Sequence, residues 1–300
     1  MQDIGPRIVK AIDKSVQEAE ARKKGRSHLG ASVLGRKCLR QIWYGFRWMH
    51  ITQHHGRMLR LFARGHLEEV TFIKLLRGIG MLVQEGPETG GQFTFSDHNG
   101  HFGGSCDAWV HLMENVIPGV PLDGPGLGEF KTAGEKAFID LAGKLEDYRK
   151  WVTDPVGRTF PGKGVLTSKP EHYVQMQIYM HYFKLKWALY VVVCKNTDDL
   201  YVEVIHYKAE MAAAYTDRAK QLVEASHPPA RISKDPSWWE CKFCDFREIC
   251  HRSAVPAKNC RSCIYSKPVE NGEWACDKFH STIPSDYVPL GCDNWDPIME

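Results

Sequence analysis

The sequence lacks a long apolar run and carries almost no net charge. Its longest apolar stretch, residues 187–194 (WALYVVVC), is far too short to span a bilayer. The first residues form a charged amphipathic pattern rather than a signal peptide. A net charge of +3 over 300 residues says little about binding partners. We therefore expect an intracellular protein without membrane association.

The charge is unevenly distributed even though it nearly cancels. Residues 22–48 carry eight Lys or Arg side chains and no acid, and aromatic residues follow closely. This mixture suits a phosphate backbone and stacked bases, although a solvated loop and helix face would explain it equally well. We predict that Arg36, Lys37 and Arg40, together with Lys136 further along the chain, contact DNA.

Periodicity and turn residues predict a mixed α/β fold. Helices are expected at 3–24, 38–48, 55–79, 135–151, 171–186 and 208–226, and strands at 81–84, 91–96, 103–112, 127–132, 188–195 and 200–206. This order predicts a central mixed sheet flanked by helices and followed by a metal-stabilised, cysteine-rich region. We place the division between a core at 1–252 and a C-terminal module at 253–300.

Two of the predicted strands carry acids that could share one metal ion. Residues two apart share a face of a strand, so Glu129 and Lys131 point together and Phe130 points the other way. If the strands at 103–112 and 127–132 are neighbours, Asp107 converges on the same point. Two carboxylates suit Mg²⁺ or Mn²⁺, which can activate water for attack on a phosphate, and a lysine can orient that water. The alternative is an edge strand with a solvated charged face.

The order Asp107, Glu129, Lys131 resembles the PD-(D/E)xK nuclease superfamily, whose members share a restriction-endonuclease-like core. A second feature resembles its RecB-type branch, because Gln175 and Tyr179 lie one helical turn apart and match the QxxxY motif of that branch. The resemblance implies that these two side chains help to position metal-bound groups or DNA. The alternative is a polar residue beside an aromatic core stripe.

The helix expected at 55–79 places acids on a broad apolar face. An unpaired buried charge is costly, so an acid there needs a partner. The resemblance implies that this helix supplies a metal-site residue four positions after a glycine, which selects Glu69 after Gly65. Periodicity alone does not separate Glu69 from Glu68. His66 could also face the site, although a hydrogen-bonded structural histidine is the simpler interpretation.

Seven of the ten cysteines fall in the last 60 residues, and without a secretion signal such clustering favours metal over disulfides. Cys241, Cys244 and Cys250 form a C-x2-C-x5-C pattern. These three cysteines can ligate one metal centre, and an iron–sulfur cluster requires a fourth ligand. Cys38, far upstream, is the candidate fourth ligand. This arrangement resembles the CRISPR-associated iron–sulfur exonucleases and the nuclease domain of the AddAB helicase–nuclease. The alternative is a zinc site completed by His251.

The resemblance covers roughly residues 30 to 252. It implies an Mg²⁺- or Mn²⁺-dependent DNA exonuclease whose core is closed by a [4Fe–4S] cluster. It further implies action on single-stranded DNA ends in recombination, repair, phage replication or CRISPR spacer processing. The implied location is the cytoplasm of a bacterium or phage-infected cell. A recombination or replication protein is a possible partner. No Walker A loop is present, which argues against a full helicase–nuclease. Two rivals are a catalytically inactive DNA-binding accessory protein and a non-nuclease iron–sulfur or zinc protein.

The last cysteines depart from that family pattern. They follow the spacing C-x2-C-x12-C-x15-C and comprise Cys260, Cys263, Cys276 and Cys292. Four thiolates suffice for a closed tetrahedral zinc site, with a second iron–sulfur cluster as the alternative. The segment has too little apolar content to fold alone, so we expect a metal to organise it for DNA binding, partner docking or capping. Cys106 and Cys194 fall in strand patterns and are expected to be buried core thiols.

Overall fold

The computed structural model describes residues 4–22, 25–113, 116–117 and 122–299. The chain forms two compact units that interleave in sequence. Unit 1 comprises Met1–Lys24, His54–Phe95 and Ser105–Ala212, and unit 2 comprises Gly25–Gln53, Ser96–Gly104 and Ala213–Glu300. The cysteine-rich end therefore belongs to the same unit as residues 25–53, while the division at 252 stays a prediction. No helix in the described part of the chain is long and apolar enough to cross a membrane.

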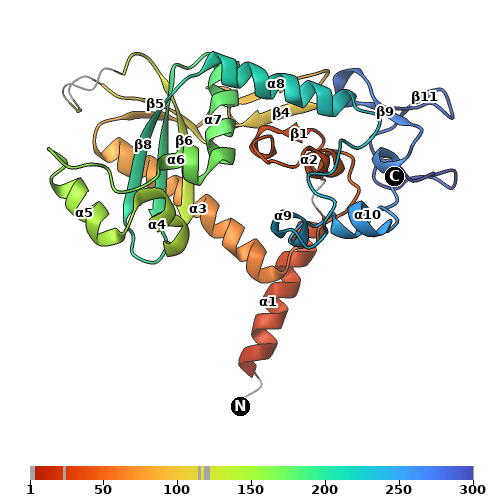
Figure 1. The fold of residues 1–300 in the computed structure, drawn as a ribbon, viewed down its shortest axis with the longest axis horizontal. Coiled ribbons are helices and arrows are strands. Elements are labelled where there is room, and N and C mark those ends of the chain that lie inside the picture. Colours follow the sequence, from red (N-terminus) through yellow and green to blue (C-terminus); the bar gives the residue numbers. More distant parts are fainter. Residues whose placement is uncertain (1–3, 23–24, 114–115, 118–121, 300) are drawn as a thin grey trace. The chain divides into compact units, whose positions relative to one another are not determined.

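A five-stranded sheet forms the centre of unit 1 (Figure 1). Its strand order is β2 (Leu82–Gln84), β5 (Ala108–His111), β6 (Gly126–Ala133), β7 (Trp187–Cys194) and β8 (Leu200–His206). β6 and β7 run parallel, and the other neighbouring pairs are antiparallel. β7 is buried along its whole length, as expected for an interior strand rich in β-branched residues. Cys194, in β7, is fully buried, as is Cys106, which confirms both as core thiols.

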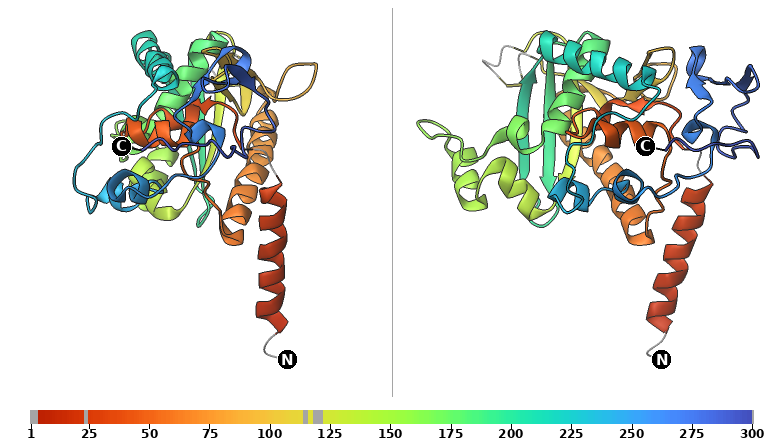
Figure 2. Two further views of the ribbon diagram at one scale, coloured as in Figure 1. Left: turned by 90° about the vertical axis from the view of Figure 1, so that its right-hand side faces the viewer. Right: turned by 45° about the vertical axis from the view of Figure 1, so that its right-hand side comes forward.

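Helices cover both faces of this sheet, which confirms the predicted mixed α/β class. On one face, Phe130 of β6 joins Phe72 and Ile73 of α3 (Gly56–Gly78) in a single apolar cluster, with the Phe72 and Phe130 rings 5.5 Å apart. The other face is covered by α4 (Glu135–Ala142) and α7 (Pro170–Phe183), with α6 (Gly164–Ser168) packed on both helices (Figures 1 and 2).

The N-terminal helix α1 (Ile4–Ala21) packs against the beginning of α3. Asp13 pairs with Arg60 of α3, and Gln17 Nε2 donates a 3.2 Å hydrogen bond to the carbonyl of His54. Beyond these contacts α1 extends away from the sheet of its own unit (Figure 2). The helix predicted at 3–24 is therefore present over Ile4–Ala21, and residues 3, 23 and 24 lie outside the described residues.

Two predicted elements are interrupted. The strand at 103–112 breaks at Cys106–Asp107 into β4 (Phe102–Ser105) and β5, and the two parts join different sheets. The helix at 135–151 breaks at Gly143 into α4 and α5 (Leu145–Thr153). Gly143 has φ +91°, and a Cβ there would meet Pro161 at 2.8 Å. Phe138 and Tyr148 still pack edge to face across this break, which is why the apolar periodicity continues through it.

Unit 2 is built mostly from short elements. β1 (Leu29–Gly30) pairs in parallel with β4, and β3 (Thr94–Asp97) lies on the other side of β4. α2 (Leu39–Phe46) and most of α8 (Ala209–Glu224) belong to this unit. The C-terminal part comprises α9 (Trp239–Lys242), α10 (Arg247–Arg252), the 3-10 turns η2 (Cys260–Ser262) and η3 (Glu270–Gly272), and a sheet of β9 (Ser266–Pro268), β10 (Trp274–Cys276) and β11 (Ser281–Ile283). A further 3-10 turn, η1 (Ala31–Val33), follows β1.

Two arginines lie inside unit 2 among aromatic rings. The Arg261 guanidinium is 4.1 Å from the ring centre of Trp48 and 4.7 Å from that of Trp274, and the Arg47 guanidinium is 5.1 Å from the Trp274 ring. Burial lowers the pKa of Arg47 to about 10 and that of Arg261 to about 9. Both values lie well above neutral pH, so both side chains remain cations.

Candidate active site and metal centres

Asp107, Glu129 and Lys131 come together at one point of the unit 1 sheet. Asp107 directly precedes β5, and its Oδ2 accepts a 2.8 Å hydrogen bond from the backbone N–H of Phe130 in β6. Lys131 Nζ lies 2.5 Å from Glu129 Oε1 and 4.0 Å from Asp107 Oδ2. Because β5 and β6 are antiparallel neighbours, the sheet itself brings these groups together.

Glu129 is the most deeply buried charge of the group. Its side chain has no solvent exposure, and among the described residues no group gives either carboxylate oxygen a well-directed hydrogen bond. Burial raises the pKa of Glu129 to about 7, with Lys131 opposing the shift and Asp107 adding to it. One ammonium group does not replace the full hydration of a buried carboxylate, and hard divalent cations prefer carboxylate oxygens as ligands. The chemistry of these side chains therefore suits a Mg²⁺ or Mn²⁺ ion, which would require the acids to move closer together than the described residues place them.

Lys131 stays charged despite its burial. Burial alone would lower the pKa of Lys131, but the carboxylates of Glu129 and Asp107 raise it overall. Its side chain retains 28% exposure, in contrast to the fully buried Glu129. The ammonium group is thus held beside the acids, and the partial exposure belongs to the side chain as a whole.

Helix α3 contributes a third acid to the group. Burial raises the pKa of Glu69, and the negative charge of Asp107 adds to the rise, while His66 and Lys131 oppose it. His66 Nδ1 lies 3.1 Å from Glu69 Oε1, and the Glu69 side chain is 29% exposed. Glu69, the acid favoured over Glu68, therefore lies within electrostatic range of both strand acids.

Gln175 and Tyr179 lie one turn apart on α7 and are both buried. Gln175 Nε2 approaches the Tyr179 hydroxyl at 3.4 Å. Burial raises the pKa of Tyr179, and the charge of Glu129 raises it further. The hydroxyl therefore stays protonated next to the carboxylates, where it can donate a hydrogen bond.

Two residues that the sequence analysis missed adjoin this group. Tyr190 of β7 is the register partner of Glu129 in the parallel β6–β7 pair, and its hydroxyl lies 2.7 Å from Nδ1 of His172 at the start of α7. Burial lowers the pKa of His172 to about 4, and the charges of Lys131 and Lys169 lower it further. His172 is therefore neutral at physiological pH. The only sequence signal for His172 is its place three residues before Gln175 on the same helix.

A pocket open to solvent, with a volume of about 420 Å³, adjoins Lys131 on the α4–α7 side of the sheet. Its polar lining includes Lys131, Thr132, Ser168, Lys169, Glu171, His172 and Tyr190. Two lysines against one glutamate give this lining a positive balance. Such a lining suits a phosphate group adjacent to the acids.

The first cysteine set gathers within unit 2. Cys38 directly precedes α2, Cys241 lies in α9, Cys244 follows that helix and Cys250 lies in α10. Burial raises the pKa of the thiols of Cys38, Cys241 and Cys244, and in each case the charge of Cys250 adds to the rise. These interactions place the four thiols near one another, although most of the chain separates Cys38 from the other three in sequence.

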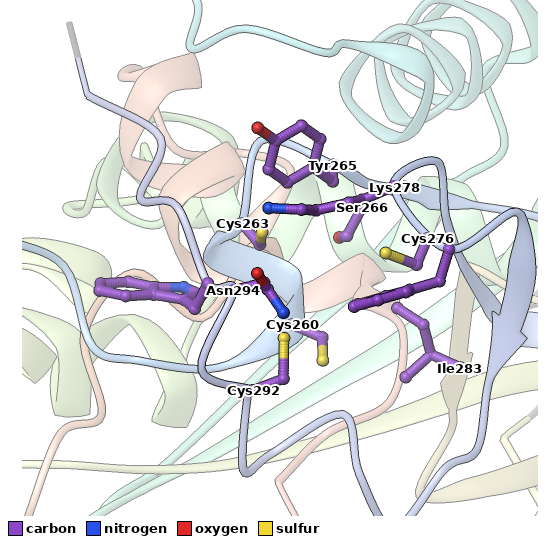
Figure 3. A pocket seen from close by; sticks show the side chains of 11 residues that line it. Cys260, Cys263, Tyr265, Ser266, Cys276, Lys278, Ile283, Cys292 and Asn294 are labelled. Atoms are coloured by element: carbon purple, nitrogen blue, oxygen red, sulfur yellow. The ribbon is translucent and has the colours of Figure 1, made fainter.

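The second cysteine set lines a single pocket in unit 2 (Figure 3). Burial raises the pKa of Cys260 to about 11, and the charges of Cys292, Cys263 and Cys276 add to the rise. All ten cysteines are free thiols in the structure. Across the described residues, no three or more His, Cys, Asp or Glu side chains meet closely enough to hold a metal ion. Metal binding at the acids or at either cysteine set therefore remains a proposal.

The basic residues predicted to contact DNA differ in their accessibility. Lys136 is exposed in the first turn of α4, beside the pocket at Lys131. Lys37 is exposed and pairs with Glu240 at 3.1 Å. Arg36 is half-buried, whereas Arg40 is 9% exposed and its Nε donates to the carbonyl of Pro229. The guanidinium of Arg40 is thus engaged inside unit 2 rather than displayed to a ligand.

No protein-family model matches the chain, and no curated protein matches it in sequence. Among solved structures it is similar to the crystal structure of SSO0001, with a TM-score of 0.43, 15% identity and coverage of 81% of this chain and 96% of that one. It is also similar to an alkaline exonuclease (LHK-Exo) from Laribacter hongkongensis, alone and in complex with dAMP. Both comparisons give a TM-score of 0.39 and cover 65% of this chain and 86% of that one, at 16% and 15% identity. Likenesses at TM-scores this low establish no activity for this chain.

Proposed function

We propose that this protein is an Mg²⁺- or Mn²⁺-dependent nuclease of the PD-(D/E)xK type that hydrolyses DNA phosphodiester bonds. The observation that carries the proposal is the buried Glu129 carboxylate. Within the part of the chain that the structure describes, it receives no well-directed hydrogen bond, and it lies in one group with Asp107, Glu69 and Lys131. A charged group of this kind is costly in a fold unless it binds something.

Each residue of the site has a separate role in the proposed hydrolysis. Glu69, Asp107 and Glu129 offer oxygen ligands to the cation, directly or through water. When bound, such a cation neutralises charge on the scissile phosphate and lowers the pKa of a water ligand. Lys131 orients the attacking water and stabilises the charge that develops in the transition state. Tyr179, kept protonated by burial, lies within electrostatic range of Glu129 and is able to donate a hydrogen bond to a metal-bound water or to DNA.

The pocket beside Lys131 is the proposed place for the substrate backbone. Lys169 and Ser168 line it together with Lys131, and Lys136 is exposed on the adjoining helix α4. Neutral His172 can contribute an N–H donor without competing with the lysines for charge. A phosphate next to the scissile one would therefore meet two cations and several neutral donors.

The finer assignment follows the family resemblance. We propose that the protein is an exonuclease that acts on single-stranded DNA ends in recombination, repair, phage replication or CRISPR spacer processing. We place it in the cytoplasm of a bacterial or phage-infected cell, where it works with a recombination or replication protein. We also propose a [4Fe–4S] cluster at Cys38, Cys241, Cys244 and Cys250. The mutual electrostatic influence of these thiols within unit 2 supports that ligand set.

The nuclease proposal is tested on end-labelled DNA with Mn²⁺ or Mg²⁺. Glu129→Gln and Lys131→Ala are each expected to remove cleavage while leaving DNA binding in place. The matched controls are Glu146→Gln and Lys150→Ala, because this exposed Glu–Lys pair on α5 has a similar separation of 2.7 Å. Wild-type protein that binds DNA but never cuts it would support the inactive accessory protein instead. Equal cleavage by wild type and both site variants would refute the site.

A further inference from the structure

The last four cysteines converge from separate segments of unit 2. Cys260 and Cys263 bracket the turn η2, Cys276 ends β10, and Cys292 lies in the loop after Gly291. All four line one pocket, together with Tyr265, Lys278 and Trp295 among others. Figure 3 shows these cysteines around the same space, although they are spread over more than thirty residues of sequence.

Backbone hydrogen bonds fix the turn that carries the first two thiols. The N–H of Cys263 donates to the carbonyl of Cys260 at 3.1 Å, and the N–H of Cys260 donates to the carbonyl of Val288 at 2.8 Å. Asn259, fully buried, accepts from the N–H of Ser262 at 3.1 Å. Cys276 is held by strand pairing on both sides, opposite Ser266 and Ser281. Backbone hydrogen bonds therefore fix the positions of Cys260, Cys263 and Cys276 at the edge of this pocket.

Two buried cations belong to the surroundings of this pocket, because Arg47 contacts two of its lining residues and Arg261 lies in the turn η2. Arg47 and Arg261 are each 2% exposed. Arg47 Nη2 donates to the carbonyls of Cys263 and Ser266 at 3.1 and 3.0 Å, and Arg261 Nη1 donates to the carbonyl of Phe46 at 3.0 Å. Within the described residues, neither arginine forms an ion pair with a carboxylate. A buried cation without a counter-charge is costly.

We propose that Cys260, Cys263, Cys276 and Cys292 bind one structural zinc ion, and that this zinc–thiolate centre is the counter-anion of Arg47. Four thiolates around Zn²⁺ carry a net charge of −2, which offsets the positive charge of the Arg47 guanidinium. The carbonyl of Cys263, a ligand residue, accepts directly from Arg47, so the two charges are linked through one residue.

Zinc fits this pocket better than a cluster does. A C-x2-C turn beside a small antiparallel sheet, with two further single cysteines, supplies the closed tetrahedral set that structural zinc takes. In the described part of the chain the four thiols surround the pocket without meeting at one point. Their side chains need to close on one centre at Zn–S distances of about 2.3 Å. This inference goes beyond the nuclease proposal and does not depend on it.

The first test measures metal in the intact wild-type chain, purified anaerobically without chelators. Zinc and iron are quantified by inductively coupled plasma mass spectrometry, and the zinc environment by X-ray absorption. One zinc per chain with four sulfur ligands is expected, and titration with an organomercurial should release it. Absence of zinc, or an iron content of two clusters per chain, would overturn the proposal.

Variants then assign the ligands and the counter-charge. Cys276→Ser and Cys292→Ser should each lower zinc content at least fivefold and leave iron unchanged, whereas the core-thiol control Cys194→Ser should keep both metals. Arg47→Met should weaken zinc retention against a chromophoric chelator about tenfold, with partial rescue by Arg47→Lys. Where Arg47→Met fails to fold, the Arg47→Lys value alone is compared with wild type. Zinc retained equally by the Cys276→Ser, Cys292→Ser and Cys194→Ser proteins would overturn the ligand assignment.

Discussion

The two units place their reactive side chains by different means. In unit 1, Asp107, Glu129 and Lys131 lie on or beside strands that an extensive backbone ladder and an apolar cluster hold in register. In unit 2, the proposed metal ligands lie on turns, short helices and a sheet of three-residue strands. A regular sheet can hold charged groups in position without a bound ion, whereas such short elements need a further link between them. Metal loss should therefore affect the two units unequally.

The largest expected effect is on the C-terminal half of unit 2 when metal is removed. Structural metal–thiolate centres contribute on the order of 10 kcal/mol to folding. We expect amide hydrogen exchange in residues 241–292 to accelerate by at least a hundredfold after treatment with an organomercurial and a chelator. The amides of β6 and β7 should keep their protection, as measured by mass spectrometry. Equal loss of protection in both units would remove the distinction between them.

The next effect concerns chemistry in unit 1. Lys131→Ala should lower the rate of DNA cleavage by about 10²- to 10⁴-fold, the range for loss of a group that stabilises charge or transfers a proton. Iron and zinc contents should stay at wild-type values, because the substitution lies in the other unit. Single-turnover cleavage and metal analysis of the same preparation check both statements. A Lys131→Ala protein that loses its metals would show that the two units are not independent.

A smaller effect concerns stability of the metal-free protein. The folded-state pKa of Glu129 is raised from 4.5 to about 7, so its ionisation destabilises the fold as pH rises from the lower to the higher value. Glu129→Gln mimics the protonated form and should stabilise the metal-free chain by up to about 3 kcal/mol at pH 8, with little gain at pH 4.5. Urea unfolding in the presence of a chelator at both pH values measures this. A gain that does not grow with pH would contradict the assigned cause.

The smallest expected effect is at the pocket beside the acids. Lys169→Ala should raise the KM for DNA about tenfold, equivalent to about 1.4 kcal/mol, with little change in kcat. The salt dependence of binding should also become shallower, because one phosphate contact is lost. Lys150→Ala serves as the control, since Lys150 pairs with Glu146 on the exposed face of α5. A fall in kcat instead would place Lys169 in the chemical step.

Local patterns in the sequence predict most of the fold. The strand at 200–206 has the bounds of β8, and the long helices differ from their predicted ends by a few residues. The predictions fail where non-local packing decides the conformation. Gly143 interrupts a helix because the chain turns against Pro161, and Asp107 leaves the strand pattern because its carboxylate bonds to β6. Neither contact is visible in local periodicity.

In the candidate site, too, local patterns predict some residues correctly and miss those that depend on non-local packing. Because side chains alternate between the two faces of a strand, the sequence predicts that Glu129 and Lys131 share a face. In the structure, Lys131 Nζ lies 2.5 Å from Glu129 Oε1. Tyr190 was missed because its place beside Glu129 depends on the register of two parallel strands that are distant in sequence. Arg40 was predicted to contact DNA because basic and aromatic residues alternate there, but that pattern does not reveal which of the cations the fold buries.

The hydrogen bond from the Phe130 amide to Asp107 has a consequence for how the site tolerates mutation. Its donor belongs to the main chain, so almost any amino acid at position 130, proline excepted, can supply it. The separation of Asp107 from Glu129 is therefore a property of two paired strands rather than of any neighbouring side chain. Substitutions in the apolar cluster can alter the stability of unit 1 and still leave the spacing of the two acids unchanged. Sequence drift around this site can accordingly be extensive before its geometry is lost.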